Sequence, residues 1–196
     1  MGCACDRLPV NVIYPTMKIK IIFTVCALLA TSMGIATASD EVKFSMSRKT
    51  QAYSNTRSAN QRGVVNRSTE SNDIVYVITV ESTSLKDLEN ITIEYNIYYE
   101  EAQPGSTGKP PIRTLSGKQT VERLASRKKT EFDTEAITIK ETRLDGNYYW
   151  ASGASNQVKD RVVGSVIKAF NSEGKLLGQY INPSNIATKC EWKTPR

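Results

Sequence analysis

Three adjacent aromatic residues, Tyr148-Tyr149-Trp150, are the side chains of this sequence best suited to bind a ligand. They lie between Gly146 and Gly153. Aromatic rings stack on sugar faces or anchor protein partners, with a large contact area at small cost in conformational entropy. Alternatively, the rings pin a strand or loop to the edge of a β-domain, since adjacent strand residues point to opposite faces. We predict Tyr148, Tyr149 and Trp150 as ligand-binding residues, with one or two rings exposed to solvent.

Neighbouring carboxylates are the residues that a second chemistry, glycoside hydrolysis, would require. Glu100 and Glu101 are adjacent, so on a strand they point to opposite faces, whereas Asp133 and Glu135 share a face. A catalytic pair needs a shared cleft that separates the two pKa values. No pattern in the sequence predicts such a cleft. We therefore expect solvated strand ends, and keep a histidine-free carboxylate hydrolase as the third functional alternative.

Histidine is absent from all 196 residues. This excludes catalytic systems that depend on an imidazole, such as Ser-His-Asp and Cys-His, and disfavours catalytic zinc. Ser126 lies near Lys128 and Lys129, but nothing predicts the strand–turn–helix setting that would orient a Ser-Lys pair. We predict no catalytic residue, no metal and no cofactor.

The N-terminal region has the pattern of a secretory signal peptide. Met17–Lys20 is a short basic start, Ile21–Ala30 is apolar, and Ala36-Thr37-Ala38 is a small-x-small exit. The apolar run is shorter than the roughly 20 residues that span a bilayer. We expect a signal peptide over 17–38, preceded by a possible mis-started extension over 1–16, and a secreted or periplasmic product without a transmembrane segment after cleavage.

The remaining residues, 39–196, are enough for one domain. Removing three basic and one acidic residue from totals of 26 and 20 leaves a net charge of +4. The basic triplet Arg127-Lys128-Lys129 has acidic neighbours, including Glu122 and Glu131, so a solvated hairpin end is the favoured interpretation. Nucleic-acid binders concentrate basic residues on one face. We expect no nucleic-acid partner.

Cysteine usage limits how this domain is stabilised. Cys3, Cys5 and Cys26 precede the expected cleavage site, which leaves Cys190 without a partner for an internal disulfide. Cys190 is then either buried or available for an intermolecular bond. Trp192 nearby favours a tail that packs down and buries the thiol.

The elements that position these residues are predicted to be short β-strands. Val42, Phe44 and Met46 alternate with polar residues, which predicts a first strand with one buried face. Within the polar tract of residues 50–72 we expect that strand to continue past Tyr53 and then a flexible crossing. Further strands are predicted over residues 73–82, 91–100, 119–124, 131–140, 160–170 and 175–180.

Turn signals separate these strands. Residues 83–90 contain Leu85 and Leu88, which we expect to hold a short turn against the core, and Gln103–Pro111 must be a long loop. Gly174 supplies the positive φ of a hairpin between the last two strands. No amphipathic helix is evident. We predict an all-β, antiparallel β-sandwich, immunoglobulin-like, of about seven or eight strands. The expected core is Ile74, Tyr76, Ile78, Val80, Ile93, Tyr95, Ile97, Ile139, Val166 and Phe170.

Four segments carry a family resemblance: Ile91–Tyr99, Gly164–Phe170, Gly174–Leu177 and Tyr180–Pro183. With their tyrosine-rich strands, glycine hairpin and proline stop, they resemble uncharacterised small secreted bacterial proteins with an immunoglobulin-like or fibronectin-III-like β-sandwich. The resemblance implies a fold and transfers no catalytic residue.

The expected function is therefore binding. We predict a secreted or periplasmic, non-catalytic interaction domain that binds a protein or a surface glycan through loop ends or an exposed sheet edge. The first alternative is a carbohydrate- or envelope-polymer-binding module that uses Tyr148, Tyr149 and Trp150. Exposure of these rings distinguishes the two.

Overall fold

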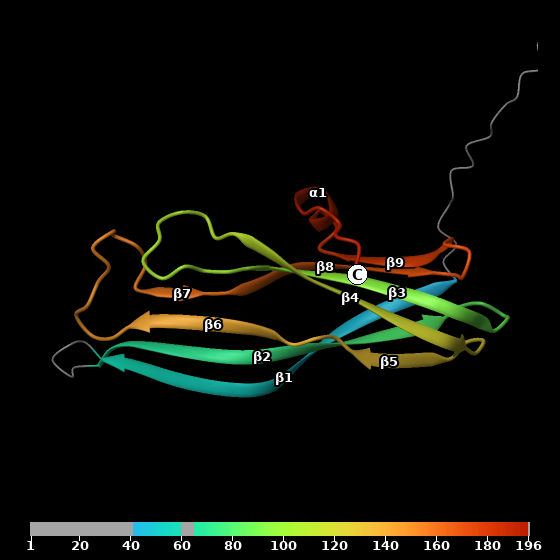
Figure 1. Ribbon diagram of the computed structural model, residues 1–196, viewed down its shortest axis with the longest axis horizontal. Coiled ribbons are helices and arrows are strands. Elements are labelled where there is room, and N and C mark those ends of the chain that lie inside the picture. The colour runs from blue at the N-terminus through green and yellow to red at the C-terminus, as the bar shows by residue number, and fades with distance from the viewer. Residues whose placement is uncertain (1–40, 60–64, 196) are drawn as a thin grey trace, which may run out of the picture. The chain divides into compact units, whose positions relative to one another are not determined.

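The computed structural model describes residues 41–59 and 65–195, all within one compact unit, Ala36–Arg196. The predicted signal peptide, the extension before it and the first three cysteines lie outside the described residues. The described residues form nine strands and one short helix (Figure 1): β1 Val42–Ala59, β2 Val65–Ser82, β3 Leu88–Glu100, β4 Ile112–Leu124, β5 Lys129–Asp133, β6 Ile137–Leu144, β7 Gln157–Lys159, β8 Arg161–Phe170, β9 Leu176–Asn182 and α1 Ile186–Lys189.

The strands form two antiparallel sheets. The first has the order β1-β2-β6-β7, with β5 also paired to β2, and the second has the order β4-β3-β8-β9. β1, β2 and β6 occupy the places of strands A, B and E of an immunoglobulin domain, and β3, β8 and β9 those of C, F and G. The predicted antiparallel β-sandwich is confirmed, with nine strands among the described residues. Two strands were not predicted separately. β7 was not predicted, and the single strand predicted over residues 131–140 is divided between β5 and β6.

The principal core lies between the two sheets. Inward-facing residues of β2 and β3 are almost fully buried, with Ile78, Val80, Ile93 and Ile97 at 0% exposure. Period-two alternation along these strands places such side chains on one face. Eight of the ten predicted core residues belong to this cluster. The other two do not, because Val166 packs in a second cluster and Phe170 lies half-buried at a register shift between β8 and β9.

The second cluster lies where the C-terminal segment covers β3 and β8. Ile186 of α1 and Cys190 pack against Tyr98 and Val166, and the Tyr98 hydroxyl donates a hydrogen bond to the carbonyl of Glu191 (3.2 Å). Cys190 is buried, and burial raises the pKa of its thiol. At four residues, α1 is too short to produce a helical period in the sequence.

The polar tract of residues 50–72 is mostly a long hairpin. β1 pairs with β2 from Val42 opposite Ser82 to Ala59 opposite Val65. The prediction that β1 continues past Tyr53 is confirmed. The predicted crossing after this strand falls on residues 60–64, which lie outside the described residues. This part of β1 carries exposed polar side chains on both faces, so it lacks the apolar alternation that marks a strand.

Two boundaries also differ from the prediction. Leu88 packs against the core, but Leu85 is exposed, because β3 begins at Leu88 and leaves Leu85 in the connecting turn. β4 begins at Ile112 rather than Gln119. The first residues of β4 have no apolar face of their own, and backbone pairing with β3 holds them in an extended conformation.

The two sheets touch where β1 and β9 begin. The backbone N–H of Glu41 donates to the carbonyl of Leu177 (3.1 Å), and that of Thr83 donates to the carbonyl of Glu41 (2.9 Å). Gly178 is buried at this junction, and a Cβ atom there would overlap the carbonyl oxygen of Val42. The junction therefore requires a residue without a side chain.

We predict that Gly178→Ala lowers the free energy of unfolding by roughly 1–3 kcal/mol, because the added methyl group forces β1 away from β9. Urea denaturation followed by tryptophan fluorescence measures the change. The control is Gly108→Ala in the 101–111 loop, where an added Cβ would meet only the Ser106 hydroxyl, at 3.5 Å. Equal stability of the two variants would show that the junction does not depend on close approach.

Candidate binding site between the sheet edges

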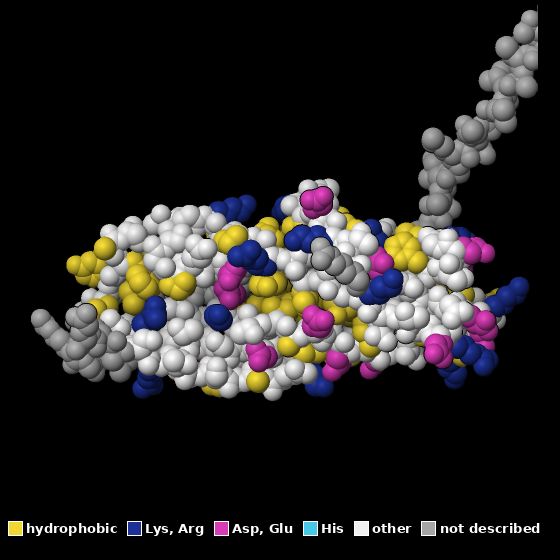
Figure 2. Space-filling model, in the orientation of Figure 1, with side chains coloured by type: hydrophobic (Ala, Val, Ile, Leu, Met, Phe, Trp, Pro, Cys, Tyr) yellow, Lys and Arg dark blue, Asp and Glu magenta, His cyan; other side chains and the backbone are white. Residues whose placement is uncertain are grey.

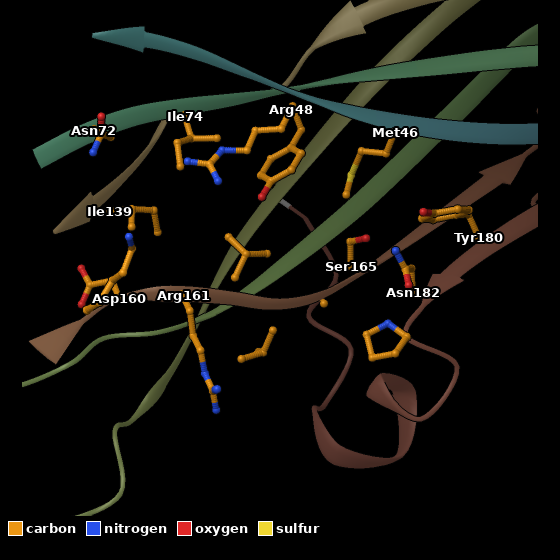
Figure 3. A pocket seen from close by; sticks show the side chains of 16 residues that line it. Met46, Arg48, Asn72, Ile74, Ile139, Asp160, Arg161, Ser165, Tyr180 and Asn182 are labelled. Atoms are coloured by element: carbon orange, nitrogen blue, oxygen red, sulfur yellow. The ribbon is translucent and has the colours of Figure 1, made fainter. Parts of the chain in front are cut away.

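A cavity opens on the side of the sandwich where β1 and β9 separate beyond their junction. Its volume is about 550 Å³, within the range of natural ligand sites. Met46 of β1 and Tyr180 of β9 lie on opposite sides of it, and the first residues of β8 complete the wall (Figure 3).

Much of the cavity wall is the hydrophobic core itself. Ile74, Tyr76 and Ile139 belong to the principal core cluster, and Met46 packs against it. Burial raises the pKa of the Tyr76 phenol, an effect that the charge of Arg48 opposes. Tyr76 thus presents a neutral hydroxyl at neutral pH. Figure 2 shows hydrophobic side chains at the surface along the middle of the visible face, with acidic and basic side chains above and below them.

Three cationic side chains line the cavity, and two of them have carboxylate partners. Lys159 pairs with Glu141 (2.7 Å), and Arg161 pairs with Glu100 (2.6 Å). Within the described residues Arg48 forms no ion pair. Figure 3 shows the Arg161 side chain pointing away from the cavity and the Arg48 guanidinium beside Ile74. Arg48 is therefore the cation available to a ligand.

Ser165 of β8 adds an unpartnered polar group to the wall. The residue is 1% exposed, and its Oγ has no hydrogen-bond partner within the described part of the chain. It lies opposite Ile97 of the core, which places its side chain between the sheets. An unsatisfied buried hydroxyl costs about 1–3 kcal/mol, which a polar ligand group would recover.

Asp160 fixes the end of the cavity where the chain crosses from β7 to β8. Its buried carboxylate accepts the backbone N–H of Ala102, after β3, at 2.7 Å and that of Lys140, on β6, at 2.9 Å. Its own N–H donates to the carbonyl of Lys140 (2.8 Å). One side chain thus ties both sheets together between Lys159 and Arg161.

The predicted aromatic residues lie on a different part of the molecule and do not line this cavity. Tyr149 is 80% exposed and Tyr148 is 38% exposed, whereas Trp150 is half-buried with its ring against Gly105. The Ser152 hydroxyl donates to the carbonyl of Gly105 (2.6 Å) and joins the loops 101–111 and 145–156 at one end of the sandwich (Figure 1). Two of the three rings reach the surface, and their contact with a ligand stays a prediction.

The structure does not bring the predicted carboxylates together. Glu100 pairs with Arg161 and lines a second cavity, beneath α1, whereas Glu101 pairs with Arg113 (2.8 Å) and lines a third, beside Pro104. Asp133 and Glu135 are exposed and line none of the three cavities. Neither pair shares a cleft.

The Ser126 hydroxyl donates to the carbonyl of Ser84 (2.9 Å), and Lys129 pairs with Glu81 (3.3 Å). Among the described residues no hydrogen bond joins the Ser126 hydroxyl to a lysine side chain. Within residues 41–59 and 65–195, no cluster of three or more histidine, cysteine, aspartate or glutamate side chains could hold a metal ion. No helix in the same residues is long and apolar enough to cross a membrane.

Sequence reasoning missed Arg48, Ser165 and Tyr180. One signal for Arg48 was present: the alternation Val42, Phe44, Met46 places residue 48 at the next inward position, where a charged side chain is exceptional. Ser165 and Tyr180 lay within predicted strands without a distinguishing pattern.

No family model and no curated protein matches this chain. Several solved structures resemble it weakly, including the following two. One, a Northeast Structural Genomics Consortium target solved by X-ray crystallography, is 6% identical over 81% of this chain and 96% of its own, with a TM-score of 0.34. The other, a crystal structure from Akkermansia muciniphila, is 10% identical over 81% of each chain, with a TM-score of 0.29.

We predict that Asp160→Asn lowers the free energy of unfolding by roughly 1–3 kcal/mol. Each carboxylate oxygen of Asp160 accepts a hydrogen bond from a backbone N–H, and in the variant one of these oxygens is replaced by an NH₂ group, which cannot accept that bond. Chemical denaturation measures the change. The control is Asp133→Asn, whose exposed carboxylate lies 3.7 Å from Lys49 and contributes little. If the control were destabilised as much, Asp160 would have no special role in joining the sheets.

Proposed function

We propose that this protein is a secreted or periplasmic, non-catalytic domain that binds a protein partner at the cavity between β1 and β9. Export is supported by the pattern of Met17–Ala38, a basic start followed by an apolar run and a small-x-small exit. Binding is supported by the shape and chemistry of the cavity.

One observation carries this proposal: among the described residues Arg48 has no carboxylate partner, and its guanidinium lies beside core residues that line the cavity. Sites that bind ligands are concave and mostly apolar, with few polar groups that fix orientation. Here Met46, Ile74 and Tyr76 provide the apolar wall, while Arg48 and the Ser165 hydroxyl provide the polar groups. The arrangement suits an apolar group that carries a negative charge.

The test uses anilinonaphthalene sulfonate, an anionic dye whose fluorescence rises in apolar surroundings. We expect saturable binding to the native protein and about fivefold weaker binding to Arg48→Gln, since a solvent-exposed charge contributes up to about 1 kcal/mol. Fluorescence titration at two salt concentrations measures both the affinity and its electrostatic part.

The control is Arg113→Gln, which removes an exposed arginine that lines none of the three cavities. Its dye affinity should equal that of the unchanged protein. Absence of dye binding, or equal weakening in both variants, would contradict the proposed site.

A second candidate function is glycan binding at the 145–156 loop. It is favoured by the 80% exposure of Tyr149, since an exposed aromatic ring can stack on a sugar face. The neighbouring Trp150 ring packs against Gly105 and so connects this loop to the 101–111 loop.

We predict that, if this surface binds glycans, Tyr149→Ala abolishes retardation of the protein in gels containing soluble envelope polysaccharide. A ring that stacks on a ligand contributes about 1–3 kcal/mol, enough to remove weak retention. The control is Tyr53→Ala, which removes an exposed ring from β1. If Tyr149→Ala is retarded in the gel as much as the control, the 145–156 loop does not contact the glycan.

A further inference from the structure

β1 offers a long unpaired edge beside the cavity. It spans 18 residues, and its pairing within the described residues is with β2 alone. Unpaired backbone groups at a sheet edge accept another extended chain. β5 and β7 are too short for this, with five and three residues. On β4, Arg113 and Arg123 are already paired with acidic residues of this chain.

The charges of β1 specify the kind of partner. The strand holds four basic residues and no acidic one: Lys43, Arg48, Lys49 and Arg57. Among described residues, the ion pair in this set joins Lys49 to Asp133, at 3.7 Å with both side chains well exposed. A second copy of β1 would bring like charges together, which is destabilising. An acidic strand is the complementary partner.

A β-bulge places Arg48, Tyr53 and Arg57 on the same face of β1. Arg48 lies opposite Tyr76, and Tyr53 lies opposite Asn72; both opposing residues line the cavity. Their spacing of five would put Arg48 and Tyr53 on opposite faces of a regular strand. The register shift between Thr50 and Ala52 returns Tyr53 to the face of Arg48. Four residues further, Arg57 occupies the same face.

We infer that the free edge of β1 accepts an acidic, extended segment of another protein as an added strand. Carboxylates of the segment face Arg48 and Arg57, and its apolar side chains contact Tyr53 and the cavity wall. The inference rests on the proposed function and names the chemistry of the partner. The register fixes the spacing of the carboxylates: β2 covers the same stretch in eight steps, from Tyr76 opposite Arg48 to Ser68 opposite Arg57.

The test is a fluorescently labelled peptide of about a dozen residues, with alternating valine and threonine and two glutamates eight positions apart. A second peptide has the same composition with the glutamates one position closer, so that they face opposite sides. Anisotropy measures affinity, and hydrogen exchange read by mass spectrometry locates the protected amides. We expect the first peptide to bind roughly tenfold more tightly than the second and to protect β1.

The variant Arg48→Glu with Arg57→Glu should lose this binding by a further factor of about ten or more. Its matched control carries the same charge change on β4, Arg113→Glu with Arg123→Glu, and should bind like the unchanged protein. Equal affinity for both peptides, protection outside β1, or equal loss in the two variants would overturn the inference.

The dye titration separates the two proposals. If the dye binds in an Arg48-dependent way and neither peptide binds, the added strand is wrong and the cavity remains a binding site. If neither dye nor peptide binds, both proposals fall. Binding of the correctly spaced peptide with loss on charge reversal at Arg48 and Arg57 supports both.

Discussion

The buried carboxylate of Asp160 is the interaction on which the rest of the sandwich depends. At this residue the chain leaves one sheet and enters the other, and the carboxylate accepts a backbone N–H from each side of the crossing. Hydrogen bonds from backbone N–H groups to an ionised carboxylate are stronger than those to a neutral acceptor. The two sheets are thus joined by hydrogen bonds to Asp160 at one place, and among the described residues the hydrogen bond between Glu41 and Leu177 joins them where β1 and β9 begin. The cavity lies between these two connections.

The sequence predicted the fold class because alternation is strongest where one face is buried. Ile91, Ile93, Tyr95 and Ile97 all enter the core, and the hairpin at Gly174 forms with the expected positive φ of 78°. Prediction failed for strands whose two faces are both exposed to solvent, and for strands that form through backbone pairing alone. The outer half of β1 has no apolar face, and β7 has only three residues. Their pairing comes from neighbouring strands, which leave no mark in the local sequence.

The candidate site was less predictable than the fold. The aromatic cluster was visible because side-chain type alone marks it, and the structure places it in a loop away from the cavity between β1 and β9. That cavity depends on Arg48 of β1 and on Ser165 and Tyr180 of the β8–β9 hairpin, and β1 lies far from this hairpin in sequence. The hydrogen-bond donors to the Asp160 carboxylate are backbone N–H groups, which every residue except proline carries. Such a site is a property of strand register and of where the sheets separate.

The segment that covers β3 and β8 has a consequence for incompletely folded chains. Tyr98 and Val166 belong to strands that are complete well before Ile186, Cys190 and Trp192 are synthesised. Without this segment in place, the outer face of β3 and β8 has an apolar strip in contact with water. Exposed strips of this kind attract chaperones and promote aggregation of incomplete chains. The segment from Ile186 to Trp192 therefore shields the outer face of β3 and β8 from water.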